Sequence, residues 1–202
     1  MYKLIKNTLI IGLCLCCFAC GNNTGNYTPK PVGYLRLTVP EHQYQTLDTI
    51  LPFGFDYSQS AICEIETKDS GRYWVDIHYP TLNATLKMNY RPLRNDLRNL
   101  AIDEEKIIKF HIDKGRPDDV QVNFIDDPNS QLYGRIFELY GKHVATPFQF
   151  WASDSTDHFL KGTLYFNFAP NNDSLQPVID FLKEDMMAMI YSFHWKNRDS
   201  IR

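Results

Sequence analysis

Alternating apolar and polar positions recur in short stretches along most of this chain. A period of two is typical of strands that bury one face and expose the other. Aromatic and β-branched residues dominate these stretches, as a half-buried sheet prefers. The pattern predicts strands at residues 34–39, 62–67, 73–79, 84–90, 120–125, 132–139, 144–152 and 159–168.

A helical period replaces this alternation in residues 93–113, where apolar positions recur every three or four residues. Gly115 and Pro117 follow as stop signals. The pattern leaves open a break in this helix near Asp103.

A second helix is predicted close to the end of the chain. Asp173 and Ser174 offer an N-cap, and Pro177 would fall in the first turn, where a missing amide donor costs little. The apolar positions that follow at helical spacing are Val178, Leu182, Met186, Met189, Ile190 and Phe193. This face should pack on the sheet.

Short, turn-rich connections between the predicted strands favour antiparallel neighbours. We therefore expect a single α+β domain, with a largely antiparallel sheet of about seven or eight strands and two helices packed on it. This order of elements is similar to that of a Mog1/PsbP-like sandwich.

The first residues of the chain have a different pattern. Lys3 and Lys6 precede an apolar run over residues 8–18, and the small residue Ala19 comes directly before Cys20. This order is typical of a secretory signal peptide with too short an apolar core to span a bilayer. A cysteine at the cleavage point indicates a bacterial lipoprotein that is acylated on Cys20. Two or more acyl chains, at about 0.8 kcal/mol per buried methylene, make a stable anchor.

The alternatives are a plain secretory leader with incidental cysteines, or an uncleaved helix. On the lipoprotein interpretation, residues 1–19 are the signal peptide and residues 20–32 a lipidated cysteine and flexible tether. Residues 33–196 then form the globular domain, and residues 197–202 form a polar tail.

Charge and cysteine content exclude several classes of protein. The formal net charge is −3, and the leader holds two lysines and no acidic residue, so the mature chain is more acidic still. A nucleic-acid-binding protein needs a basic face, and we expect no nucleic-acid partner. Only Cys63 lies outside the leader and the acylation site, which leaves no pair for a disulfide. Its apolar surroundings favour a structural thiol.

One polar stretch, between two predicted strands, carries candidate chemistry. It comprises Asp154, Ser155, Thr156, Asp157 and His158, and Phe159 and Lys161 follow it. An acid, hydroxyls and an imidazole could serve a hydrolase if they converged on one atom beside an oxyanion hole. Contiguous residues in a tight turn rarely converge, whereas Asp and Ser commonly bind backbone amides in turns. We therefore interpret the stretch as a structural or partner-binding corner without catalytic residues.

No cofactor or metal is expected from the remaining motifs. The six histidines fall outside paired Cys/His patterns and His-Glu-x-x-His motifs, although dispersed ligands could still meet in space. The sequence contains no glycine-rich phosphate loop of either common type.

Four stretches carry a family resemblance: Tyr-Thr-Pro-Lys-Pro-Val-Gly-Tyr-Leu-Arg at 27–36, Pro-Phe-Gly-Phe-Asp-Tyr at 52–57, the corner and its flanks at 149–166, and residues 170–195. In these stretches the chain resembles the gliding-motility lipoprotein GldD family of Bacteroidota. The resemblance implies an envelope lipoprotein that is needed for gliding and connected with type IX secretion, with no enzymatic activity. Partners would be the membrane, through acylated Cys20, and other envelope lipoproteins or secretion and gliding components.

Two functions thus remain in competition: a non-catalytic interaction protein, and an envelope hydrolase or ligand-binding lipoprotein acting on glycan, lipid or peptide. A deep pocket beside Asp154 and His158 would favour the second. Residues 21–24 lack the acidic side chains that follow the cysteine in surface-exposed lipoproteins of this phylum, so the periplasmic face is expected.

Overall fold

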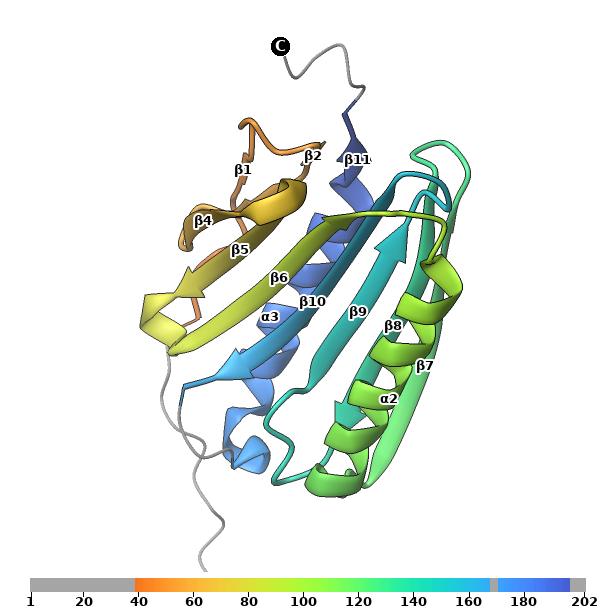
Figure 1. Cartoon of the computed structure of the whole chain (residues 1–202). Coiled ribbons are helices and arrows are strands. Elements are labelled where there is room, and N and C mark those ends of the chain that lie inside the picture. Colours follow the sequence, from red (N-terminus) through yellow and green to blue (C-terminus); the bar gives the residue numbers. More distant parts are fainter. Residues whose placement is uncertain (1–38, 168–170, 197–202) are drawn as a thin grey trace, which may run out of the picture. The chain divides into compact units, whose positions relative to one another are not determined.

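A computed structural model describes residues 39–167 and 171–196, apart from the side chain of residue 174. Figure 1 shows the strands and helices within these ranges. The strands are β1 (Tyr44–Thr46), β2 (Phe53–Gly54), β3 (Asp56–Ser58), β4 (Ile62–Lys68), β5 (Arg72–Tyr79), β6 (Ala84–Pro92), β7 (Asp119–Asp127), β8 (Leu132–Tyr140), β9 (Phe148–Ser153), β10 (His158–Phe166) and β11 (His194–Trp195). The helices are α2 (Leu97–Gly115) and α3 (Asn172–Ser192).

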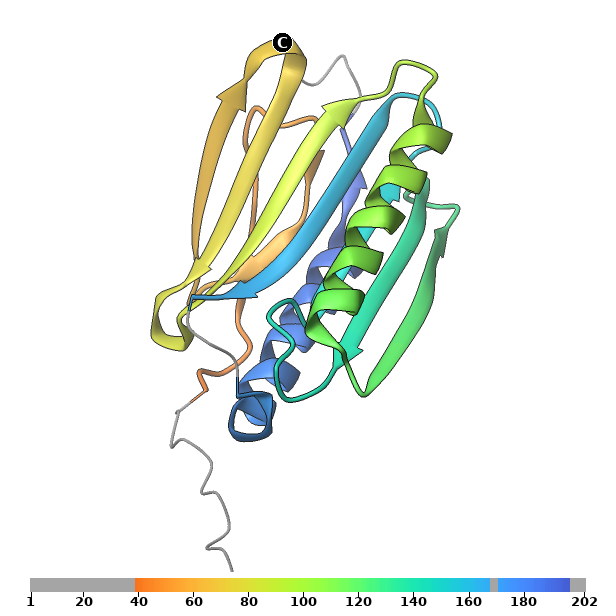
Figure 2. The same ribbon diagram turned by 60° about the horizontal axis from the view of Figure 1, so that its bottom comes forward.

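Seven of the described strands form one antiparallel sheet in the order β4-β5-β6-β10-β9-β8-β7. After β6 the chain passes through α2 and resumes at β7 on the far edge, and β10 then returns to pair with β6. The helices α2 and α3 lie on opposite faces of the sheet (Figures 1 and 2). The single α+β domain with a largely antiparallel sheet is therefore confirmed.

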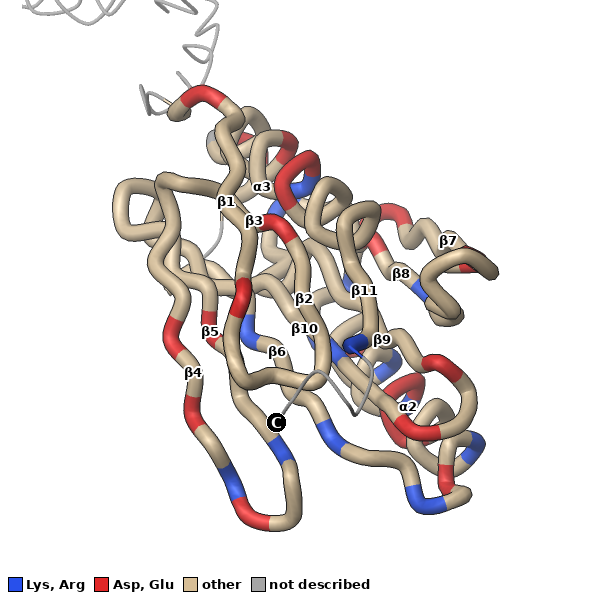
Figure 3. Tube along the Cα trace, turned by 90° about the horizontal axis from the view of Figure 1, so that it is seen from above, with Lys and Arg blue, Asp and Glu red and all other residues tan. Residues whose placement is uncertain are grey.

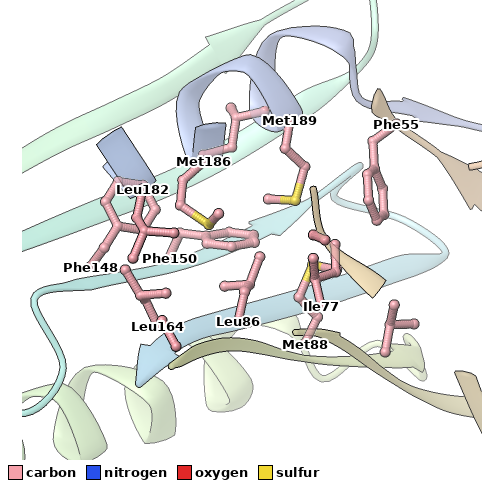
Figure 4. Packing of buried hydrophobic residues seen from close by; sticks show 14 of the residues in the cluster. Phe55, Ile77, Leu86, Met88, Phe148, Phe150, Leu164, Leu182, Met186 and Met189 are labelled. Atoms are coloured by element: carbon pink, nitrogen blue, oxygen red, sulfur yellow. The ribbon is translucent and has the colours of Figure 1, made fainter. Parts of the chain in front are cut away.

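The main core lies between the sheet and α3. Figure 4 shows Leu182, Met186 and Met189 of α3 directed toward the strands, where they meet Leu86 and Leu164. All five side chains are buried. Burying an apolar side chain of this size stabilises the fold by about 1.5–3 kcal/mol, so this face supplies most of the apolar stabilisation.

A glycine makes room for an aromatic ring in this core. Gly162 of β10 pairs with Phe150 of β9, and a Cβ on Gly162 would lie 2.2 Å from Cε1 of Phe150. The phenyl ring therefore occupies the space that any other residue at 162 would need.

The opposite face is only partly covered. Beneath α2 a smaller buried cluster contains Ile108 of the helix with Phe137, Leu139 and Val144. Figure 2 shows α2 over one half of the sheet, whereas the half formed by β4, β5 and β6 stays open on this side. Trp74 of β5, which is 49% exposed, lies on the open half.

Two predicted boundaries are wrong beside α2. The strand predicted for residues 144–152 begins at Phe148, because Val144 closes a turn onto the carbonyl of Gly141 and packs beneath α2. The helix predicted from residue 93 begins at Leu97, because the preceding turn takes Asn95 into the left-handed region at φ 60°. The helix then runs through Asp103 without a break.

The start of α3 also differs from the prediction. The helix begins at Asn172, whose side-chain amide donates to the carbonyl oxygens of Gly141 and Val144. This anchor moves the start ahead of the predicted cap at Asp173 and Ser174. Pro177 therefore lies in the second turn rather than the first.

Several small elements are missing from the prediction. The strands β1, β2, β3 and β11 have two or three residues each, too few to show a period. The predicted strand at residues 34–39 lies outside the described residues except for Val39, as do the leader, the tether and the polar tail.

Candidate functional site at one end of the sheet

The polar corner singled out in the sequence connects β9 to β10, and the Asp154 side chain organises it. Oδ1 of Asp154 accepts hydrogen bonds from the backbone N–H groups of Thr156 at 3.0 Å, Asp157 at 2.9 Å and His158 at 2.8 Å. Oδ2 accepts a fourth hydrogen bond from the Thr156 hydroxyl at 3.0 Å. Both oxygens of this carboxylate therefore hold the turn in shape.

Two opposing effects act on the pKa of Asp154. Partial burial raises it, but the hydrogen bonds from His158, Thr156 and Asp157 favour the charged carboxylate. The net result is a pKa below the ordinary aspartate value. A carboxylate stabilised in this way is a poor proton acceptor and a good structural anchor.

The backbone at the tip of the corner adopts a conformation that leaves two hydroxyl side chains exposed. Ser155 has φ 72°, in the left-handed region, and its N–H donates to the Ser153 hydroxyl at 2.9 Å. The side chains of Ser155 and Thr156 are exposed as a result. The corner thus presents hydroxyl groups on a fixed backbone.

The imidazole of His158 connects the corner to distant parts of the chain. Nδ1 of His158 lies 2.7 Å from the hydroxyl oxygen of Tyr90, in β6. Its ring stacks on Trp195 of β11 with a centroid separation of 4.8 Å. The indole N–H of Trp195 donates in turn to the carbonyl oxygen of Gln131. These contacts give His158 a structural role, because its ring packs against residues from other strands.

The next two predicted residues point to the α2 side of the sheet. Phe159 is buried and stacks on Trp151. Nζ of Lys161 lies 2.6 Å from Oε1 of Glu104, so Lys161 joins β10 to α2. The predicted group therefore divides: Asp154, Ser155, Thr156 and His158 form the corner, whereas Phe159 and Lys161 belong to the face beneath α2.

A shallow hollow of about 210 Å³ adjoins the corner. Its lining includes Ile50, Pro52, Tyr73 and His158. Ile50 is 69% exposed and gives the hollow an apolar contact beside the ordered polar turn. We call this hollow together with Ser155 and Thr156 the corner surface.

Sequence reasoning missed a second cluster of ionisable groups, on the α3 face. Nδ1 of His42 lies 2.7 Å from Asp185 and Nε2 lies 2.9 Å from Glu184, so both ring nitrogens meet a carboxylate. Burial, followed by the charge of Asp185, raises the pKa of Tyr79, and the same two causes raise that of Tyr44 to about 12. The cluster joins the segment before β1 to α3.

Other candidate groups are dispersed. Among the described residues no group of three or more His, Cys, Asp or Glu side chains is placed to hold a metal ion. Cys63 is half-buried, and burial, followed by the nearby Asp76 and Glu64, raises its pKa to about 11. A thiol in this state is a poor nucleophile.

The fold and the corner define a single-domain α+β protein with an antiparallel sheet between two helices. In the part of the chain that the structure describes, neither helix is long and apolar enough to cross a membrane. A family model described as "Gliding motility lipoprotein GldD" matches residues 24–195. The chain therefore belongs to the gliding motility lipoprotein GldD family, and the resemblance seen in the sequence is confirmed.

Other comparisons add little. No curated protein matches the sequence. Among solved structures, the chain is similar to the solution structure of cyanobacterial PsbP (CyanoP) from Synechocystis sp. PCC 6803, with 18% identity and a TM-score of 0.43. The similarity covers 82% of this chain and 99% of that one.

Proposed function

We propose that this family member is a lipid-anchored protein of the cell envelope that supports gliding motility and type IX secretion by binding other envelope proteins. It catalyses no reaction in this proposal. Acylated Cys20 holds it to the membrane, and the domain faces the periplasm. The corner surface is the contact site for a partner protein.

The observation that carries the proposal is the use of the Asp154 carboxylate. Four donors from the corner itself surround its two oxygens, so Asp154 fixes the position of the exposed Ser155 and Thr156. A surface that is already ordered loses little conformational entropy on binding. This favours recognition by a preformed surface over acid-base chemistry.

Apolar exposure beside the corner supports the same conclusion. Ile50 lines the hollow together with Tyr73 and His158 and gives the corner surface an exposed apolar contact. Interfaces between proteins commonly combine an apolar centre with a polar rim. The combination of Ile50, the hollow and the two hydroxyls fits that arrangement.

The test is photo-crosslinking in living cells of the source organism. A crosslinking amino acid replaces Ile50 in one strain and Phe124 of β7, which is 74% exposed, in a control strain. We expect Ile50 to capture a specific envelope protein that Phe124 does not capture. Equal capture at both positions, or at neither, would contradict the proposed contact site.

The anchor has its own test. Mass spectrometry of the mature amino terminus should find a diacylglyceryl group on Cys20, and Cys20→Ser should release the domain from the membrane fraction. A bare amino terminus would overturn the anchor and leave the contact site to be judged by the crosslinking.

A further inference from the structure

Three arginines meet at the open end of the α2 face. Arg72 begins β5, Arg91 lies near the end of β6, and Arg94 lies in the turn before α2. Together with Ser70 and Pro92 they line a cavity of about 250 Å³. Figure 3 shows basic positions at the β4–β5 turn and along the segment that leads from β6 to α2. We call this cavity the arginine rim.

The charges in the rim do not balance. Asp96 lies 2.8 Å from Nη2 of Arg91, and among the described residues it is the one carboxylate within ion-pair distance of any of the three arginines. These three arginines and Asp96 together carry a formal charge of +2, although the whole chain carries −3. A phosphate monoester, with a charge of about −1.5 to −2 at neutral pH, would neutralise it.

The pairing of β5 with β6 places two of these positive charges opposite each other, which destabilises the fold when no anion is bound. Tyr73 pairs with Tyr90, so Arg72 and Arg91, the next residues outward, lie on neighbouring strands with their side chains on the same face. Like charges opposite one another across a sheet are destabilising. An anion held between the two guanidinium groups would turn this repulsion into attraction.

The rim is also held in place. The Nε–H of Arg72 donates to the carbonyl oxygen of Asp69 at 3.2 Å. The Asp96 carboxylate binds the Arg91 side chain and accepts from the backbone N–H of Arg94 at 2.9 Å. These bonds use few of the guanidinium donors, and the remaining N–H groups suit the fork-like recognition of phosphate.

A second hollow, of about 200 Å³, continues from the rim and shares Arg72 and Arg91 with it. Trp74, Asn89 and Lys161 stand side by side along it, because Asn89 pairs with Trp74 on one side and with Lys161 on the other. Glu104 closes the hollow from α2, bound to Lys161. An aromatic ring beside an amide, an ammonium and a carboxylate suits a ring-shaped ligand with several hydroxyl groups.

We propose that the arginine rim and the adjoining hollow bind a phosphorylated saccharide. The phosphate lies between Arg72, Arg91 and Arg94. The sugar ring packs on the part of the Trp74 ring that Lys68 leaves uncovered, Nζ of Lys68 lying 4.0 Å from the ring centroid, and its hydroxyl groups point toward Asn89 and Glu104. Pro92 lines both the arginine rim and the hollow of the corner surface, so the two sites are neighbours, but saccharide binding here does not depend on a protein partner at the corner.

The experiment is calorimetric titration of the full-length protein in detergent and phosphate-free buffer. The probes are glucose 1-phosphate, inorganic phosphate, glucose and a hexa-aspartate peptide. We expect glucose 1-phosphate to bind at least tenfold more tightly than inorganic phosphate, and glucose alone not to bind. Arg94→Gln should weaken glucose 1-phosphate at least tenfold, whereas Lys109→Gln, which removes an exposed charge elsewhere on α2, should not.

Trp74→Ala separates the two halves of the site. It should abolish the advantage of glucose 1-phosphate over inorganic phosphate while leaving phosphate binding intact. Absence of saturable binding by glucose 1-phosphate, or equal binding by Arg94→Gln, would overturn the proposal. Tighter binding of the peptide would assign the rim to an acidic protein segment instead. Nanodiscs that contain phosphatidylglycerol form a last arm, and preferential binding to them would assign it to a lipid headgroup.

Discussion

The helices α2 and α3 lie on opposite faces of one sheet, but they bury very different numbers of side chains. From α2 the buried side chain is Ile108. From α3 the buried apolar side chains are Leu175, Val178, Ile179, Phe181, Leu182, Met186, Met189 and Ile190. The α3 face therefore resembles a closed protein interior, whereas the α2 face is a small core beside an open, charged surface.

This difference separates stability from recognition. A face that is closed by apolar packing stabilises the fold, but its side chains are buried and cannot contact a ligand. The half-covered face keeps Trp74, the arginine rim and the bonded pair Lys161–Glu104 within reach of solvent. Both proposed binding regions lie away from the α3 interior, one on the open half of the α2 face and the other at the end of the sheet.

The largest expected effect compares the two faces directly. Leu182→Ala removes a fully buried side chain from the α3 interior and should lower the free energy of unfolding by about 4 kcal/mol. Ile108→Ala should cost about 2 kcal/mol, because the α2 cluster is small and borders solvent. Urea denaturation measures both. Equal losses would show that the two faces contribute alike.

A second comparison concerns glycines. Gly162→Ala should cost about 1–3 kcal/mol, because the new Cβ would displace the ring of Phe150. At Gly115, near the end of α2, the nearest atom to a Cβ is 3.9 Å away, so Gly115→Ala should change stability by about 0.5–1 kcal/mol at most, in the stabilising direction. Thermal unfolding of the two variants checks this; a harmless Gly162→Ala would refute the tight packing.

The Asp154 carboxylate in the corner should make the free energy of unfolding depend on pH. Asp154→Asn should cost about 1–2 kcal/mol at pH 7, because charged acceptors bind amides more strongly than neutral ones. The pKa of Asp154 is lowered in the folded state, so its contribution is complete above the usual value of about 3.9 and is lost as pH falls through the folded value. The deficit of the variant should therefore shrink in acid.

Urea denaturation of both proteins between pH 7 and pH 2 measures this deficit. Asp118→Asn, at an exposed carboxylate between α2 and β7, is the matched control and should show little deficit at any pH. A deficit of Asp154→Asn that persists unchanged in acid would contradict the role of the charged carboxylate.

The smallest effect is expected at the arginine rim. Arg72→Gln should raise stability slightly, by at most about 0.5 kcal/mol at low ionic strength, because it relieves repulsion from Arg91. The gain should disappear in about 1 M salt, which screens surface charges over about 3 Å. Lys109→Gln provides the comparison for loss of a charge alone. A destabilised Arg72→Gln would mean that the arginine supports the fold.

Much of the fold could be predicted because the spacing of apolar residues along the chain differs between helices and strands. The spacing of Leu182, Met186 and Met189 reports a buried helical face directly, and alternation reports the long strands. The sequence pattern places Val144 in a strand, because an apolar residue beneath a helix and one in a strand look alike in a short window. The start of α3 depends on Asn172 reaching a loop some thirty residues earlier, which no local pattern records.

The candidate site divides in the same way. The turn chemistry of Asp154 is local and follows from Asx preferences, so it could be anticipated. The contacts of His158 with Tyr90 and Trp195 join three separate strands and depend on the topology. The arginine rim was missed for a similar reason, because the register of β5 against β6 brings Arg72 beside Arg91 and three dispersed arginines form no motif.

Gliding and type IX export by strains that carry stability-matched surface variants test the central claim most directly. Ile50→Asp changes the corner surface and Phe124→Asp changes an equally exposed apolar site on β7. If the corner surface binds a partner, Ile50→Asp should abolish gliding and export at normal protein levels, whereas Phe124→Asp should retain both. Normal gliding by Ile50→Asp, or loss of gliding by Phe124→Asp alone, would contradict the account.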